Sequence, residues 1–245
     1  MAKLRSPAIG IGQDDFQSSA TQIHQLGTRA ETDDGRVFRY GQAGASDLVA
    51  GNCIQSSAIV ANHLATTATA TAIGLLALTF TPGATTGAAN LYAEGMLSVD
   101  TAPGNGYTYS VSGHGAIASS TAFTLTLKDA IQVALTTSSR LGLLANPYKN
   151  VIQMPVTTAT GTLVGVGGYI ISATQFGWLQ TAGPASVLIA GTPALGAIVM
   201  TPGATAGAAE IIVAAGTLIV AQIVGKMAQV GVAGKNNFCS LMIAP

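Results

Sequence analysis

Hydrophobic and polar residues alternate with a period of two in several stretches of this chain, which is the spacing of side chains along a β-strand. Residues 123–127 give the clearest case, because Phe and Leu alternate there with Thr. Other short apolar segments are bounded by Gly or Pro, as strands of a sandwich or barrel are. These segments are 96–99, 107–111, 151–156, 163–166, 169–172, 178–181, 217–224 and 238–243. The pattern predicts a mainly β fold made of small barrel or sandwich subdomains.

Three other stretches have a less regular pattern. Residues 53–80 are rich in Ala, Thr, Ile and Leu, and their Thr/Ala alternation favours strands, since a helix there would have no charged residues on its exposed face. For 128–135 a short helix and a strand after a turn are both compatible with the residues. Residues 1–24 combine Gly, Pro, Ser, Gln and Asp without periodicity, which predicts an extended N-terminal arm.

The stretch 25–40 combines charge, turn residues and alternation. An Asp-Asp-Gly turn at 33–35 separates two strand-like runs, 28–32 and 36–40. Asp opens turns and Gly adopts positive φ, so the stretch predicts a β-hairpin. Its charged side chains either hold a partner or belong to an ordinary solvated hairpin whose arginines balance the neighbouring acids. The second interpretation is favoured by the residues alone, because exposed ion pairs stabilise little.

Two similar segments begin at Thr81 and Thr201, an offset of 120 residues. Their first nine positions, TPGATTGAA and TPGATAGAA, align without a gap. Repeats at a fixed spacing indicate repeated structural units, and chance recurrence in a chain rich in Thr, Ala and Gly is the alternative. We expect two related halves, divided into an arm at 1–24, a first β-rich subdomain at 25–150 and a second at 151–245.

The chain is poor in charge. Hydrophobic residues make up 49% of it and charged residues 8%, where an ordinary soluble domain has about a quarter charged. Eleven of the 20 charged residues lie within 3–47, and none lies within 150–209. Because interspersed charges keep proteins apart in solution, we infer that other protein covers much of the surface. The formal net charge of zero argues against nucleic acid as a partner.

Compartment and cysteine state follow from simpler signals. The uncharged run is interrupted by Gly and Pro and therefore does not predict a membrane-spanning helix. The first residues lack the apolar core of a signal peptide, so we expect a soluble protein made in the cytoplasm. In that compartment Cys53 and Cys239 are expected to be buried thiols, and a long-range disulfide between them is the alternative.

Motifs for chemistry are missing from the sequence. Gly165, Gly167 and Gly168 do not complete G-x-G-x-x-G. The three histidines, at 24, 63 and 114, are far apart and form no zinc motif. We therefore expect no enzyme, no cofactor and no metal. The single tryptophan, Trp178, is either an interface anchor or a core residue, and the second role is the more common for a lone Trp.

Four segments carry a family resemblance. They read LGTRAETDDGRVFRY (26–40), YAEGMLSVDTAPGNGYTYSV (92–111), VALTTSSRLGLLANPYKNVI (133–152) and FGWLQTAGPASVLIAGTPALG (176–196). Together they resemble head proteins of tailed bacteriophages, of the decoration or capsid-stabilising kind. The resemblance implies a β-rich, β-tulip-like fold attached outside an icosahedral shell, often as a trimer.

The resulting hypothesis is a virion structural protein that binds the exterior of a capsid and stabilises its lattice. Its partners would be the major capsid protein and two further copies of itself, with no nucleic acid or membrane, and it would be made in the host bacterial cytoplasm. Arg29, Arg36 and Arg39 of the hairpin are the candidate capsid contacts. The alternatives are a head fibre or adhesin-like host-binding protein, and the major capsid protein itself, for which 245 residues is short.

Overall fold

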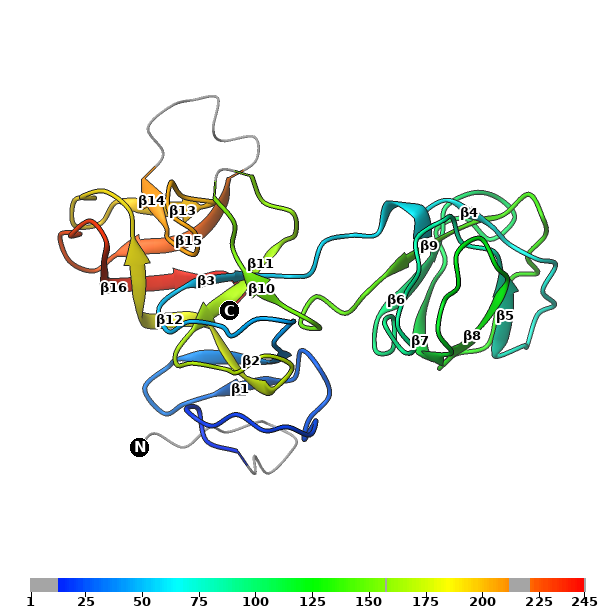
Figure 1. Ribbon diagram of the computed structural model, residues 1–245, viewed down its shortest axis with the longest axis horizontal. Coiled ribbons are helices and arrows are strands. Elements are labelled where there is room, and N and C mark those ends of the chain that lie inside the picture. The colour runs from blue at the N-terminus through cyan, green and yellow to red at the C-terminus, as the bar shows by residue number, and fades with distance from the viewer. Residues whose placement is uncertain (1–12, 157, 212–220, 245) are drawn as a thin grey trace. The chain divides into compact units, whose positions relative to one another are not determined.

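The chain folds into two compact units, shown in a computed structural model that describes residues 13–156, 158–211 and 221–244 (Figure 1). Unit 1 is formed by 1–58 together with 147–245, and unit 2 is formed by 59–146. Unit 2 is thus an insertion within the sequence of unit 1. This division differs from the expected subdomains 25–150 and 151–245, because strands from both sides of the insertion pair in one sheet.

Regular structure is almost entirely β, which confirms a mainly β fold with two subdomains. The described residues contain no α-helix and a single 3-10 turn, η1, at Ala61–His63. The strands of unit 1 are β1 (Arg29–Glu31), β2 (Val37–Gln42), β3 (Cys53–Gln55), β10 (Ile152–Gln153), β11 (Leu163–Gly167), β12 (Phe176–Ile189), β13 (Ile198–Thr201), β14 (Glu210–Ile211), β15 (Gln222–Met227) and β16 (Lys235–Met242). Those of unit 2 are β4 (Thr66–Thr67), β5 (Ala77–Phe80), β6 (Met96–Val99), β7 (Thr108–His114), β8 (Phe123–Leu127) and β9 (Arg140–Leu144).

Strand β12 organises unit 1. The sheet runs β10-β3-β11-β12-β16-β15-β13-β14, and the hairpin β1–β2 joins it at β12. The first half of β12 pairs with β2 and β11, and its second half pairs with β16 from Ala182 to Ile189. The sequence predicted that this strand ends before Gly183 and Pro184, and that prediction is wrong. The chain instead bends there with Gly183 at φ 84° and continues as a strand.

The hairpin turn explains the bend in β12. A Cβ atom at Gly183 would lie 2.9 Å from the carbonyl oxygen of Gly35 and 3.0 Å from Cα of Arg36. Only glycine gives the turn that much room, and glycine also adopts positive φ without strain. Residue 183 is therefore the point at which the hairpin and the long strand meet.

Unit 2 is a curled antiparallel sheet in the order β4-β9-β6-β7-β8-β5. The chain just beyond β4 forms an antiparallel bridge between Ala68 and Phe80 of β5, which links the two edges of the sheet. The expected hairpin at 96–111 is confirmed, with Met96 opposite Ser110. The alternation at 123–127 is confirmed as well, because Phe123, Leu125 and Leu127 are buried and the threonines between them are exposed.

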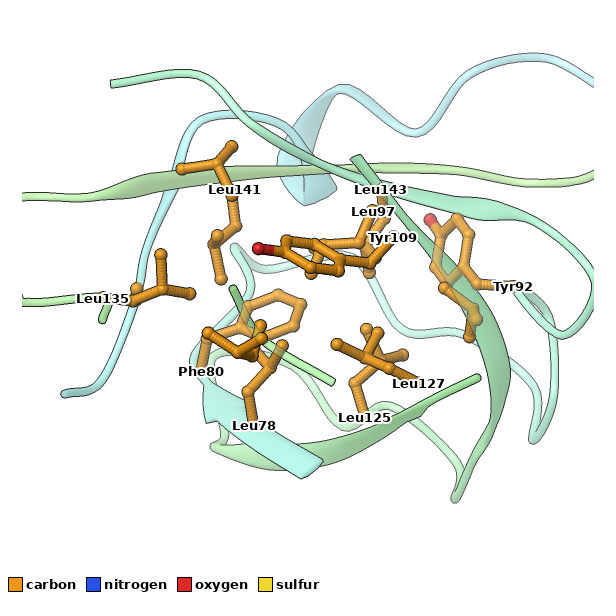
Figure 2. Packing of buried hydrophobic residues seen from close by; sticks show 14 of the residues in the cluster. Leu78, Phe80, Tyr92, Leu97, Tyr109, Leu125, Leu127, Leu135, Leu141 and Leu143 are labelled. Atoms are coloured by element: carbon orange, nitrogen blue, oxygen red, sulfur yellow. The ribbon is translucent and has the colours of Figure 1, made fainter. Parts of the chain in front are cut away.

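The core of unit 2 is mostly leucine and aromatic side chains. Figure 2 shows Leu78, Phe80, Tyr109, Leu125 and Leu141 converging from different strands. All of these residues are almost completely buried, so the curled sheet encloses its own core. Because apolar burial is the main favourable term in folding, this core is the principal source of stability for unit 2.

The structure differs from the sequence predictions in several other segments. Residues 53–80 contain only the short strands β3, β4 and β5, separated by turns and loops. Residues 128–135 form neither a helix nor a strand, apart from a bridge between Leu135 and Thr71. Of the predicted strand 217–224, the part before 221 lies outside the described residues. The two TPGAT segments follow β5 in unit 2 and β13 in unit 1, where the adjoining strands pair differently.

The described part of the N-terminal arm packs against unit 1. Ser19 exchanges two backbone hydrogen bonds with Phe176, both of 2.9 Å. Gln13 and Asp15 are buried. Residues 13–24 are thus part of the folded unit, and residues 1–12 of the predicted arm lie outside the described chain.

Candidate functional site

The hairpin forms where the sequence predicts it. Arg29 lies opposite Arg39 and Glu31 opposite Val37. At the turn Gly35 has φ 83°, and its N–H donates to the carbonyl of Thr32 at 3.0 Å. The conformation needed there explains the Asp-Asp-Gly sequence.

The aromatic face of the hairpin is buried. Phe38 and Tyr40 of β2 belong to a core cluster with Phe176 and Trp178 and are almost inaccessible to solvent. The ring of Tyr40 lies 5.1 Å from that of Trp178, and the ring of His24 lies 5.4 Å from Trp178. Trp178 is therefore a core residue, as is usual for a lone tryptophan. Burial among these rings lowers the pKa of His24.

The three candidate arginines have different surroundings. Arg29 donates to Glu31 at 2.8 Å, and its side chain is 35% exposed. Arg39 donates to the carbonyl of Gly27 at 3.1 Å. Arg36 contacts two carboxylates, at 2.9 Å from Asp34 and 3.4 Å from Asp15. Arg36 and Arg39 therefore stabilise unit 1, and the side chain of Arg29 is more exposed than that of Arg36, at 35% against 18%.

Asp15 is the most perturbed acid next to the hairpin. Its carboxylate is buried, and neither oxygen accepts a hydrogen bond from any described residue. Burial raises the pKa of Asp15 to about 6, the adjacent Asp14 carboxyl also raises it, and the Arg36 guanidinium opposes both. A buried acid with a shifted pKa beside a cavity is a recognised sign of a functional site.

Such a cavity adjoins Asp15. It has a volume of about 300 Å³ and is lined by residues of the N-terminal segment, the hairpin, β11, β12 and β16. The lining residues are Asp15, Phe16, Arg36, Phe38, Ala50, Gly51, Val166, Gly167, Gly168, Gln180, Pro184, Ala185, Ser186, Asn236 and Phe238. The sequence gave no sign of this site, because its members come from five separated segments and share no local motif.

Two polar side chains of the cavity are available to a ligand. Ser186 and Asn236 are exposed, and neither side chain makes a hydrogen bond to the described residues. Asn236 lies directly over Gly51, where an added Cβ would be 2.6 Å from the Asn236 amide oxygen. The cavity therefore combines polar groups with the rings of Phe16, Phe38 and Phe238.

Two histidines of unit 2, His63 and His114, both contact Tyr92, an arrangement that the sequence did not predict. His63 Nε2 lies 2.9 Å from the carbonyl oxygen of Thr85, and its Nδ1 lies 2.5 Å from the Tyr92 hydroxyl. A carbonyl only accepts, so Nε2 carries the proton and Tyr92 donates to Nδ1. His114 Nε2 accepts the backbone N–H of Tyr92 at 3.0 Å. These rings anchor the loop at 85–94 and leave no His63 nitrogen for a metal.

The cysteines are free thiols within the core of unit 1. Burial raises the pKa of Cys53 to about 12, with a further contribution from Cys239, and raises the pKa of Cys239 to about 11. Both are therefore protonated and unreactive at neutral pH. The expectation of buried thiols is confirmed.

Wider comparisons add no assignment. Within the described chain, no three His, Cys, Asp or Glu side chains come together as a metal site, and no helix is long and apolar enough to cross a membrane. Searches against protein-family models, curated proteins and solved structures found no match.

Proposed function

We propose that this chain is a virion structural protein that binds the outside of an icosahedral capsid and stabilises the major capsid lattice. In this role it is non-catalytic and assembles with further copies of itself, as a trimer. The phage-head resemblance of the four sequence segments suggests the partner, and the surface of unit 1 supplies the supporting observation.

Large apolar side chains project from neighbouring strands of unit 1 into solvent. Ile198 is on β13, Ile223 on β15, and Phe238 and Met242 on β16, and all four are exposed. These three strands are consecutive in the sheet, and Lys226 and Lys235 are the charged residues of β15 and β16. Lys226 lies opposite Ile198 in the sheet, so the exposed apolar side chains surround one lysine. Large exposed apolar side chains on adjacent strands are typical of surfaces that bind protein. This surface is the observation that carries the proposal.

Unit 2 has an apolar loop of its own. Ile73, Leu75 and Leu76 flank Gly74, which has φ 88°, and all three side chains are exposed. Protein bound only to the assembled shell stabilises it by mass action, since such binding favours the assembled state. A shell partner that covers apolar surfaces of this protein would account for the low proportion of charge.

The central experiment removes the protein from purified particles and then adds it back. We expect stripped particles to release DNA at a lower temperature, and added protein to restore the original release temperature. Unchanged heat and osmotic resistance after stripping would contradict the stabilising role. Copy number per particle separates a lattice-covering protein from a head fibre, which is present in few copies.

Surface variants identify the attachment face. Ile223→Lys and Met242→Lys place charges on the β15–β16 surface and should weaken binding to stripped particles by about fivefold or more, because an interface residue that loses apolar burial costs above about 1 kcal/mol. Ile170→Lys is the matched control, because Ile170 is also highly exposed on unit 1 but lies outside those strands. Equal occupancy for all three variants would exclude this face.

Arg29 is the hairpin arginine suited to a charge-reversal test. Reversing Arg36 would place a third carboxylate beside Asp15 and Asp34, which would destabilise unit 1 itself. Arg29→Glu loses only the exposed pair with Glu31, which contributes little to stability. We expect Arg29→Glu to weaken attachment with unchanged unfolding, and wild-type occupancy would remove Arg29 as a capsid contact.

A further inference from the structure

The cavity beside Asp15 lies wholly within unit 1 and has no part in the shell-binding surface proposed above, apart from Phe238 at its margin. Its wall contains aromatic rings, amide and hydroxyl groups, and a buried carboxylate that accepts no hydrogen bond from described residues. We propose that this cavity binds a neutral sugar ring.

The aromatic residues provide apolar contact for such a ring. Phe16 and Phe238 are 54% and 60% exposed although each lines the cavity. Phe38 lies deeper, and its ring is covered by the guanidinium of Arg36 at 5.4 Å. A pyranose has C–H groups on its faces and hydroxyls at its edge, so exposed phenyl faces can pack on it while polar groups reach its rim.

The polar groups match hydroxyls that both donate and accept. Gln180 is held in place because its amide nitrogen donates to the carbonyl of Pro184 at 2.8 Å. Asn236 can donate and accept, and so can Ser186. Asp15 offers two acceptor oxygens, which form an ion pair of 3.4 Å with Arg36 but accept no hydrogen bond from the described residues. A ligand hydroxyl would donate that hydrogen bond, which matters because an unpaired buried polar group costs free energy.

The lining argues against other classes of ligand. Its charged side chains, Asp15 and Arg36, cancel and contact each other, so neither an anion nor a cation finds an excess of opposite charge. An extended peptide would bind by main-chain hydrogen bonds along a strand edge. Strand β11 has a strand on both sides, and in the part of β12 that lines the cavity Pro184 has no N–H to donate. A purely apolar ligand would leave the Asp15 carboxylate with the 3.4 Å ion pair to Arg36 and no hydrogen bond.

Size agrees with a small ligand. Binding cavities for small molecules usually have volumes of about 300–1,000 Å³, and this one lies at the lower limit, at about 300 Å³. The space suits one or two sugar rings. A longer glycan would extend out of the cavity into solvent.

The test is an NMR titration of the isolated full-length protein with methyl glycosides of glucose, galactose, mannose and N-acetylglucosamine. We expect saturable shifts of the Asn236 and Gln180 side-chain amide signals for at least one of these sugars. Parallel titrations with N-acetyl-lysine methylamide and N-acetyl-phenylalanine methylamide test peptide side chains as ligands. Saturable shifts with those probes and none with the sugars would overturn the proposal, as would the absence of any saturable shift.

Variants confirm the location. Asn236→Ala and Ser186→Ala should each weaken sugar binding by about 5–10-fold, because each removes one hydrogen bond. Both residues are exposed, so folding should be retained. Ser240→Ala is the matched control on the same strand, exposed but outside the cavity, and should bind as wild type. Unchanged affinity in both cavity variants would place the sugar elsewhere and refute the site, whatever the outcome of the particle experiments.

Discussion

The two units differ in how completely their buried polar side chains are hydrogen-bonded within the described chain. In unit 2, His63, Ser139 and Thr66 are buried and each is hydrogen-bonded. In unit 1, several buried side-chain atoms have no such partner within the described chain. They belong to Gln13, Asp15, His24, Arg39, Trp178 and Thr201. Since native proteins pair nearly all buried polar groups, each exception requires an explanation.

The difference suggests separate roles. A fully paired network fixes one arrangement, so the loop held by Tyr92 and the two histidines of unit 2 is a structural element. In unit 1 several buried groups have no hydrogen-bond partner within the described chain, and one of them, Asp15, lines the cavity. We therefore expect unit 2 to be a structural unit, whereas unit 1 has a buried carboxylate to which a ligand can donate a hydrogen bond.

The largest expected effect concerns the leucine core of unit 2. Leu125→Ala should destabilise that unit by about 3 kcal/mol, because it leaves a cavity in a closely packed core. Hydrogen exchange of peptides from 59–146 measures unit 2, and the fluorescence of Trp178 reports on unit 1. A matching fall in the unit 1 transition would show that the two units unfold together and would weaken the contrast between them.

A smaller loss is expected when the histidine network is opened. Tyr92→Phe removes the donor to His63 Nδ1 and leaves a buried acceptor unpaired, which should cost about 2 kcal/mol. The same hydrogen-exchange measurement applies. Tyr107→Phe is the control, because Tyr107 is an exposed tyrosine in the same unit. Equal effects of the two variants would mean that the network contributes nothing specific.

Asp15→Asn should raise the stability of unit 1, whereas the two preceding variants lower the stability of unit 2. The folded-state pKa of Asp15, about 6, is above its ordinary value of 3.8, so its contribution to stability is present below pH 3.8 and is lost as the pH rises through 6. The variant removes this loss and should be more stable than wild type at pH 7.5, by on the order of 1 kcal/mol. Urea unfolding followed by Trp178 fluorescence at pH 4 and 7.5 measures it. A variant less stable at pH 7.5 would show that the Arg36 ion pair dominates.

The smallest effect is expected at His24. Burial lowers its pKa, so its contribution to stability is present above its unfolded value near 6.5 and is lost as the pH falls below it. His24→Phe in an Asp15→Asn background should therefore reduce the acid-induced loss of unit 1 stability between pH 7 and 5. An unchanged pH profile would mean that the pKa of His24 is not lowered in the folded protein.

Local patterns predicted the local structure well. The hairpin at 25–40, the hairpin at 96–111 and the alternation at 123–127 follow from turn residues and period-two spacing, which act over a few positions. The length of β12 was not predictable in this way, because Gly183 and Pro184 usually end strands. Glycine remains there because Gly35 and Arg36 of the distant hairpin pack against it.

The cavity beside Asp15 could not be predicted from local sequence patterns, because it also depends on contacts between distant segments. The sequence indicated that the hairpin arginines are available to a partner. Their actual exposure depends on β12 and on the segment that contains Asp15, which are distant in the sequence. Asn236 and Ser186 belong to strands whose outward residues look like any others in the sequence. Only the pairing of β12 with β16 brings them to one cavity.

Because unit 2 is inserted within unit 1, it can complete its sheet before unit 1 during synthesis on the ribosome. When residue 146 has emerged, every strand of unit 2 is available, and that unit can complete its sheet from its own segment. Strands β2 and β3 must wait for β11 and β12, and β12 in turn waits for β16 near the end of the chain. Long-range pairing of this kind is slow and exposes unpaired edges. Early completion of unit 2 shortens the unpaired chain that separates the two parts of unit 1 during synthesis.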